Sequence, residues 1–106
     1  SEVQYAAIAA TRVLSPCVVA AAVNPNQRIR VLALTLVASG GANSVRLESG
    51  ASGTALTGVM DITDNGQLTL PWNPAGWCQT AAGQLLNLEL SAATAVGGAL
   101  AYVTVE

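Results

Sequence analysis

The chain has 106 residues, of which 52% are hydrophobic and only 9% are charged, and its formal net charge is −2. Ordinary soluble domains carry roughly 25% charged residues. Four arginines without a lysine cannot form the basic stripe that neutralises nucleic-acid phosphates, so the sequence excludes a nucleic-acid partner. The length predicts a single domain over residues 1–106.

Hydrophobic side chains alternate with a period of two along most of the chain, which is typical of β-strands. In chain order, the pattern predicts about eight strands, at 4–9, 13–23, 30–38, 44–48, 59–63, 67–70, 85–91 and 100–105. The same alternation predicts a core of Leu32, Leu34, Leu36, Val45, Leu47, Leu86, Leu88 and Leu90. The longest purely apolar run, 17–23, is far shorter than the roughly 18 residues of a membrane helix, so no membrane partner is expected.

Glycine, asparagine and proline separate the expected strands at intervals of about ten residues. The segment Asp64-Asn65-Gly66 predicts a tight hairpin turn between 59–63 and 67–70, and Gly97-Gly98 predicts a turn before the last strand. The high alanine content leaves a competing prediction of one short helical turn at 77–82. Regular turns between short alternating strands favour an all-β fold, an antiparallel β-sandwich of jelly-roll type.

One expected strand, 30–38, is apolar on both of its faces. Such a strand is normally covered on both sides. A sandwich of this size would leave one of those faces in water unless a partner covered it. Together with the low charge, which is typical of obligate interfaces, this predicts a homo-oligomer.

The sequence predicts no catalytic, cofactor-binding or metal-binding site, and the chain is not expected to be an enzyme. It has no histidine, the commonest general base, and no lysine to activate a serine or cysteine nucleophile. Asp61, Asp64 and Asn65 offer far fewer oxygens than the six to eight that calcium takes. Cys17 and Cys78 are interpreted as two reduced thiols or as one disulfide.

The least ordinary segment is 70–78, which contains both tryptophans, two of the four prolines and one of the two cysteines. Two prolines and a glycine predict a loop of fixed shape. The tryptophans could close one end of the core, or at least one could fill a pocket on a neighbouring subunit, since tryptophan is over-represented at binding hot spots. The candidate interface residues are Pro71, Trp72, Asn73, Pro74 and Trp77.

Four segments, LTGVM (56–60), LPWNPAGW (70–77), TAAGQLLNL (80–88) and SAATAVGG (91–98), resemble in this order small virion proteins of tailed bacteriophages. Trp72 stands where those proteins more usually have phenylalanine. The resemblance implies a capsid decoration, or cement, protein on the outer surface of the head, made in the host cytoplasm. It implies the major capsid protein as a partner and favours a trimer over a dimer. The alternative is a tail-associated or receptor-binding β-sandwich module.

Overall fold

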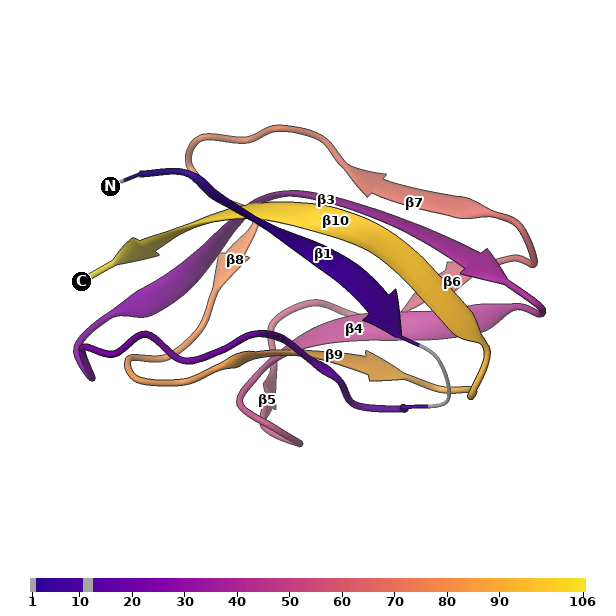
Figure 1. Cartoon of the computed structure of the whole chain (residues 1–106), viewed down its shortest axis with the longest axis horizontal. Helices are drawn as coiled ribbons and strands as arrows, with labels where there is room; N and C mark the ends of the chain where they lie inside the picture. Colours follow the sequence, from indigo (N-terminus) through magenta and orange to yellow (C-terminus); the bar gives the residue numbers. More distant parts are fainter. Residues whose placement is uncertain (1, 11–12) are drawn as a thin grey trace.

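The computed structural model of the chain describes residues 2–10 and 13–106, and these fold without a helix into two antiparallel sheets (Figure 1). Ten strands form them: β1 (Gln4–Ala10), β2 (Cys17–Val19), β3 (Arg28–Ser39), β4 (Asn43–Ser49), β5 (Thr54–Ala55), β6 (Met60–Ile62), β7 (Gln67–Leu70), β8 (Cys78–Gln79), β9 (Leu86–Leu90) and β10 (Ala95–Val105). The predicted antiparallel β-sandwich is confirmed. In the described part of the chain, no helix is long and apolar enough to cross a membrane.

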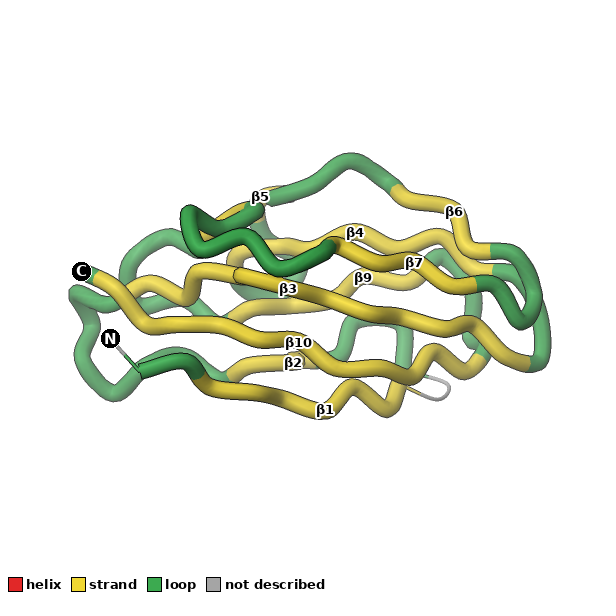
Figure 2. The backbone as a smooth tube through the Cα atoms, turned by 90° about the horizontal axis from the view of Figure 1, so that it is seen from above, coloured by secondary structure: helices red, strands yellow, loops and turns green. Residues whose placement is uncertain are grey.

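The strand order shows how ten strands form the jelly-roll arrangement that was predicted with about eight. Sheet A has the order β1-β10-β3-β7, and sheet B has the order β2-β9-β4-β5 (Figure 2). β8 pairs with β3 beyond the end of the β7 pairing, and β6 and β5 pair with successive parts of β4. These two pairs of short strands each fill one position of an eight-strand jelly roll.

The core lies between the sheets, and all eight side chains predicted for it are buried. One of them packs differently from the expectation. Ala33 pairs with Ala101, and Val31 pairs with the next residue of β10, Tyr102, so Leu32 between them has no partner on β10. This β-bulge reverses the inward and outward alternation, so Leu32 joins a small cluster with Ala101 and Val103 instead of the main core.

The turn predicted at 64–66 exists, with Asn65 at φ 59°, but it does not close a hairpin. β6 pairs with β4 in sheet B, and β7 pairs with β3 in sheet A, so the turn carries the chain across the sandwich. The turn itself bonds to the end of β3: the amide of Asn65 donates to the carbonyl of Ala38 at 2.9 Å, and the amide of Ala38 donates to the carbonyl of Gly66 at 3.2 Å. The hairpin interpretation was therefore wrong.

Three further segments differ from the sequence-based expectation. Gly97 and Gly98 lie inside β10, where a Cβ on Gly98 would collide with the backbone oxygen of Thr35, so this glycine marks a close backbone approach and not a turn. Segment 77–82 holds β8 in place of a helical turn. Of the strand expected at 13–23, β2 is the regular part. Residues before it bond to the edge of β9 irregularly, through the carbonyls of Leu14 and Pro16.

Candidate interaction surfaces

The tryptophan loop, residues 71–77, connects β7 to β8 and is held in one shape by backbone hydrogen bonds. The amides of Asn73 and Trp77 donate to the carbonyls of Leu32 and Val31 on β3, at 2.9 and 2.8 Å. Within the loop, the amide of Ala75 donates to Asn73 Oδ1 at 3.0 Å. Gly76 supplies the positive φ of 89° that the last turn needs. The loop is therefore fixed to the sheet, as its prolines and glycine predict.

Both indoles of this loop remain accessible instead of closing over the core. Trp72 is 55% exposed and Trp77 is 43% exposed. The Nε1–H of Trp77 donates to the carbonyl of Pro71 at 2.7 Å, which fixes the orientation of its ring. Two exposed tryptophans on a rigid loop form a candidate contact surface, since such side chains lose little conformational entropy on binding.

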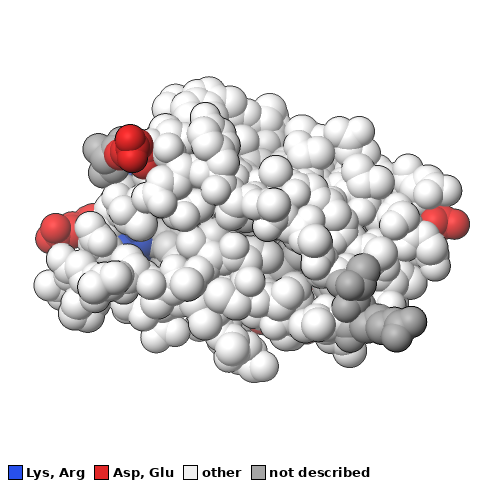
Figure 3. Space-filling view, in the orientation of Figure 1, with Lys and Arg blue, Asp and Glu red and all other residues white. Residues whose placement is uncertain are grey.

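The free edge of sheet A is a second candidate surface. β1 pairs with β10 on one side and, among the described residues, with no strand on the other. Its seven residues include no charge and no proline, the usual devices that protect an edge strand from pairing with another chain. In Figure 3, which views the molecule with β1 toward the reader, the charged side chains gather at the two ends and leave the middle nearly uncharged.

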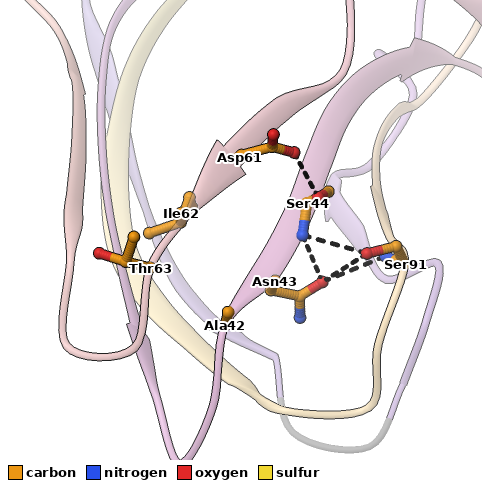
Figure 4. A pocket seen from close by; sticks show the side chains of 7 residues that line it. All are labelled: Ala42, Asn43, Ser44, Asp61, Ile62, Thr63 and Ser91. Atoms are coloured by element: carbon orange, nitrogen blue, oxygen red, sulfur yellow. Dashed lines mark hydrogen bonds between the residues drawn. The ribbon is translucent and has the colours of Figure 1, made fainter.

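A depression of about 310 Å³ opens between the sheet B strands and is lined by Ala42, Asn43, Ser44, Asp61, Ile62, Thr63 and Ser91 (Figure 4). Its polar groups bond to one another. Ser44 Oγ donates to Asp61 Oδ1 at 2.6 Å, and Asn43 Oδ1 accepts from the amides of Ser44 and Ser91 at 2.9 and 3.1 Å. Asn43 is buried, and its bonds hold the corner between β4 and the β9–β10 turn. These groups are engaged in maintaining the fold.

A charged cluster lies on the adjacent strands β4 and β9 of sheet B. Arg46 contacts Glu48 Oε2 at 2.9 Å and Glu89 Oε2 at 3.1 Å, and Asn87 Nδ2 donates to Glu48 Oε1 at 3.0 Å. Burial alone would raise the pKa of Glu48, but its interactions with Glu89, Asn87 and Arg46 outweigh burial and hold that pKa below its ordinary value. This carboxylate is charged at neutral pH and is already paired.

The two cysteines are free and lie in different sheets. Cys17 is exposed on β2, whereas Cys78 on β8 packs against the core, and this burial raises its pKa to about 11. Of the two alternatives left open by the sequence, the structure shows reduced thiols. Among the residues that the structure describes, no group of three or more histidine, cysteine or acidic side chains could hold a metal ion.

A solved structure that matches the chain is a subunit from Bacillus endospore appendages, which are described as disulfide-linked pili. The match has a TM-score of 0.51, 11% sequence identity, and coverage of 97% of this chain and 83% of the other. At this identity the likeness shows the fold. No protein-family model and no curated protein matches the sequence.

This match corrects the assignment drawn from the four sequence segments. The matched fold belongs to a bacterial appendage and not to a phage particle, so the phage resemblance was wrong. The predictions that depended on this resemblance were also wrong: the decoration role, the tail module, the capsid partner and the virion location. The physical reason lies in what the segments do: 70–77 forms the loop fixed to β3, and 91–98 forms the turn into β10. Both specify a sandwich, and a sandwich serves many functions.

Proposed function

We propose that this chain is a structural subunit that assembles with copies of itself into an extended, pilus-like fibre on a cell or spore surface. The observation that carries the proposal is the match of 97% of the chain to the fold of a pilus subunit. The low charge of the sequence and the unprotected edge of sheet A support it independently.

Strand addition between opposite edges of sheet A would build such a fibre. Three successive antiparallel pairings separate β1 from β7, so these two edge strands run in opposite directions. When one copy is placed beside another in the same orientation, its β1 meets the neighbour's β7 as an antiparallel pair. Because this contact joins two different surfaces, it does not close and can repeat without limit.

The tryptophan loop lies at the edge that this contact uses. It follows β7 directly and is bonded to the backbone of β3, so an incoming β1 would pass beside it. Trp72 and Trp77 would then pack on the neighbouring copy, with Pro71, Asn73 and Pro74 fixing their position. The interface residues proposed from the sequence therefore keep that role as candidates for the subunit contact.

A disulfide between subunits would have to begin at Cys17. Its thiol is exposed, whereas the thiol of Cys78 is partly buried and its raised pKa leaves little thiolate at neutral pH. Cys17 alone can link two copies but cannot link a whole fibre. Dimers on a non-reducing gel that disappear in Cys17→Ser would support this link, and cross-linked ladders longer than two would contradict it.

The test of the fibre uses two neighbouring alanines of β1. In a strand, successive N–H groups point to opposite sides, so Ala6→Pro and Ala7→Pro remove one N–H facing β10 and one facing the free edge. The variant that loses the outward N–H should fold normally but form no fibres by electron microscopy, while the other should lose stability. Wild-type chain that forms no fibres at high concentration, or fibres formed equally by both variants, would overturn the proposal.

A further inference from the structure

Tyr5 is the most exposed aromatic side chain in the described part of the chain, at 77%, and it belongs to the edge strand β1. Ala6 and Ile8 of the same strand pack against the core. Because successive side chains of a strand point to opposite faces, Tyr5 lies on the outer side of sheet A. Its ring is therefore accessible to another molecule beside that edge.

Trp77, near the opposite edge of the sheet, lies on the same outer side. Cys78 packs against the core, whereas Trp77 and Gln79 on either side of it line a depression of about 140 Å³ together with Arg30. The Nε of Arg30 donates to Gln79 Oε1 at 3.0 Å. The bond from Trp77 Nε1 to the carbonyl of Pro71 keeps the indole beside the residue that directly follows β7. The ring is therefore fixed relative to that edge.

The register of sheet A indicates how two level copies would meet. Strand pairing places four residues in one line across the sheet, Ala6, Leu100, Leu34 and Leu70. A neighbour that stands level and in the same orientation therefore brings its Ala6 beside Leu70, and the beginning of its β1 beside the loop that follows β7. Figure 1 shows these two segments at the same end of the sandwich. Ala6 and Leu70 both pack against the core, so inward and outward side chains keep alternating across the contact, and a shift of one residue would invert them.

We propose that, in the fibre, Tyr5 of one copy packs against Trp77 of the next. In the level register Tyr5 stands opposite Pro71, to whose carbonyl the indole of Trp77 is bonded, and both rings lie on the outer side of the sheet. A shift of two residues also preserves the alternation, but it moves Tyr5 by about 7 Å along the strand, away from Pro71. This contact depends on the proposed strand addition and selects one register of it. It removes two uncharged aromatic surfaces from water together.

Fibre assembly of single and double variants measures the contact. The quantity is the concentration of chain that remains soluble when the fibres are pelleted. Tyr5→Ala and Trp77→Ala should each raise it at least about fivefold, as expected for aromatic residues at the centre of a binding surface. Because the two rings contact each other, the double variant should raise it much less than the product of the two single effects.

The matched control is Tyr5→Ala/Ala9→Tyr. It returns a tyrosine to the outer side of β1, but four residues along the strand, where the level register places it opposite Gln67 of the neighbour. The soluble concentration should therefore stay as high as in Tyr5→Ala, and a return to the wild-type value would contradict a contact at Trp77. Circular dichroism checks that each variant is folded before assembly.

The fluorescence of Trp77 gives a readout that a role of Tyr5 inside its own subunit would not change. Trp72→Phe leaves Trp77 as the only tryptophan. On assembly its emission should shift to shorter wavelength, and quenching by acrylamide should fall. Fibres of Trp72→Phe/Tyr5→Ala, formed at a higher concentration, should remain more strongly quenched. Equal quenching in the two kinds of fibre would contradict the contact.

Engineered disulfides test the register, in a chain that also carries Cys17→Ser. Ala7 and Thr69 stand opposite each other in the level register, so oxidised fibres of Ala7→Cys/Thr69→Cys should give long covalent ladders on a non-reducing gel. Ala9→Cys/Thr69→Cys, which needs a shift of two residues, should not. Ladders from the shifted pair alone, or independent effects of Tyr5→Ala and Trp77→Ala, would overturn this contact and leave the fibre standing. A wild-type chain that forms no fibres would overturn both.

Discussion

Replacement of Asn43 by alanine tests whether the depression in Figure 4 is a structural corner of the fold. Asn43 is 4% exposed, and its amide joins β4 to the turn between β9 and β10. Nδ2 donates to the carbonyl of Ala92 at 2.8 Å and to Thr94 Oγ1 at 2.9 Å. Oδ1 accepts from the amides of Ser91 and Ala92, both at 3.1 Å.

The expected cost follows from these four long-range hydrogen bonds. Each contributes about 1 kcal/mol net, and a buried donor or acceptor that loses its partner costs about 1–3 kcal/mol. Since the turn at 91–94 can admit water in place of the side chain, we take the lower value and expect Asn43→Ala to lose about 4 kcal/mol. A domain of this length has roughly 5–16 kcal/mol of stability in total, so the variant should lose between about a quarter and three quarters of it.

Urea unfolding followed by tryptophan fluorescence measures this loss, in the variant that forms no fibres. Asn43→Asp keeps the acceptor but loses both donor bonds, so its free energy of unfolding should lie between those of the wild type and Asn43→Ala. Ser44→Ala removes only the bond to Asp61 at the rim and should cost less than about 1 kcal/mol. A loss below 1 kcal/mol for Asn43→Ala, at an unchanged denaturant slope, would refute the structural reading of this corner.

Three further predictions follow from the site geometry. At pH 8 a thiol reagent should modify Cys17 rapidly and Cys78 at least about 100 times more slowly, because only about 0.1% of a thiol of pKa about 11 is ionised at that pH. The rate at Cys78 should rise toward pH 11, and equal rates at the two cysteines would contradict the burial of Cys78. Because the pKa of Glu48 is lowered on folding, its contribution to stability is full above its ordinary pKa and is lost as the pH falls from about 4.5 through the folded value. Glu48→Gln should therefore flatten acid unfolding curves below pH 4.5, and an unchanged curve would count against the charged pair. Self-association should survive 1 M salt yet weaken in Trp72→Ala and Trp77→Ala, since salt screens ion pairs but not apolar contacts. If salt dissociates the subunits and both variants assemble normally, ion pairs and not the tryptophans hold the subunits together.

Local pattern was sufficient for the longer strands and for most of the core. Alternation alone places Leu34, Leu36, Leu86, Leu88 and Leu90 inside, because a side chain in a strand has only two directions to point. It also predicts a loop of fixed shape around the tryptophans, because proline and glycine restrict the backbone wherever they stand. These are consequences of neighbouring residues, and the sequence contains them directly.

The local pattern did not predict which strands pair with each other. The turn at 64–66 suits a hairpin, yet its flanking strands belong to different sheets, since β6 pairs with β4 and β7 pairs with β3. Tertiary pairing also places the bulge that moves Leu32, brings Gly98 into a central strand, and leaves β1 as an edge strand. Composition indicated an uncharged surface, but only the pairing of four strands assembles it into one sheet, because cross-strand neighbours are set by pairing and not by distance along the chain.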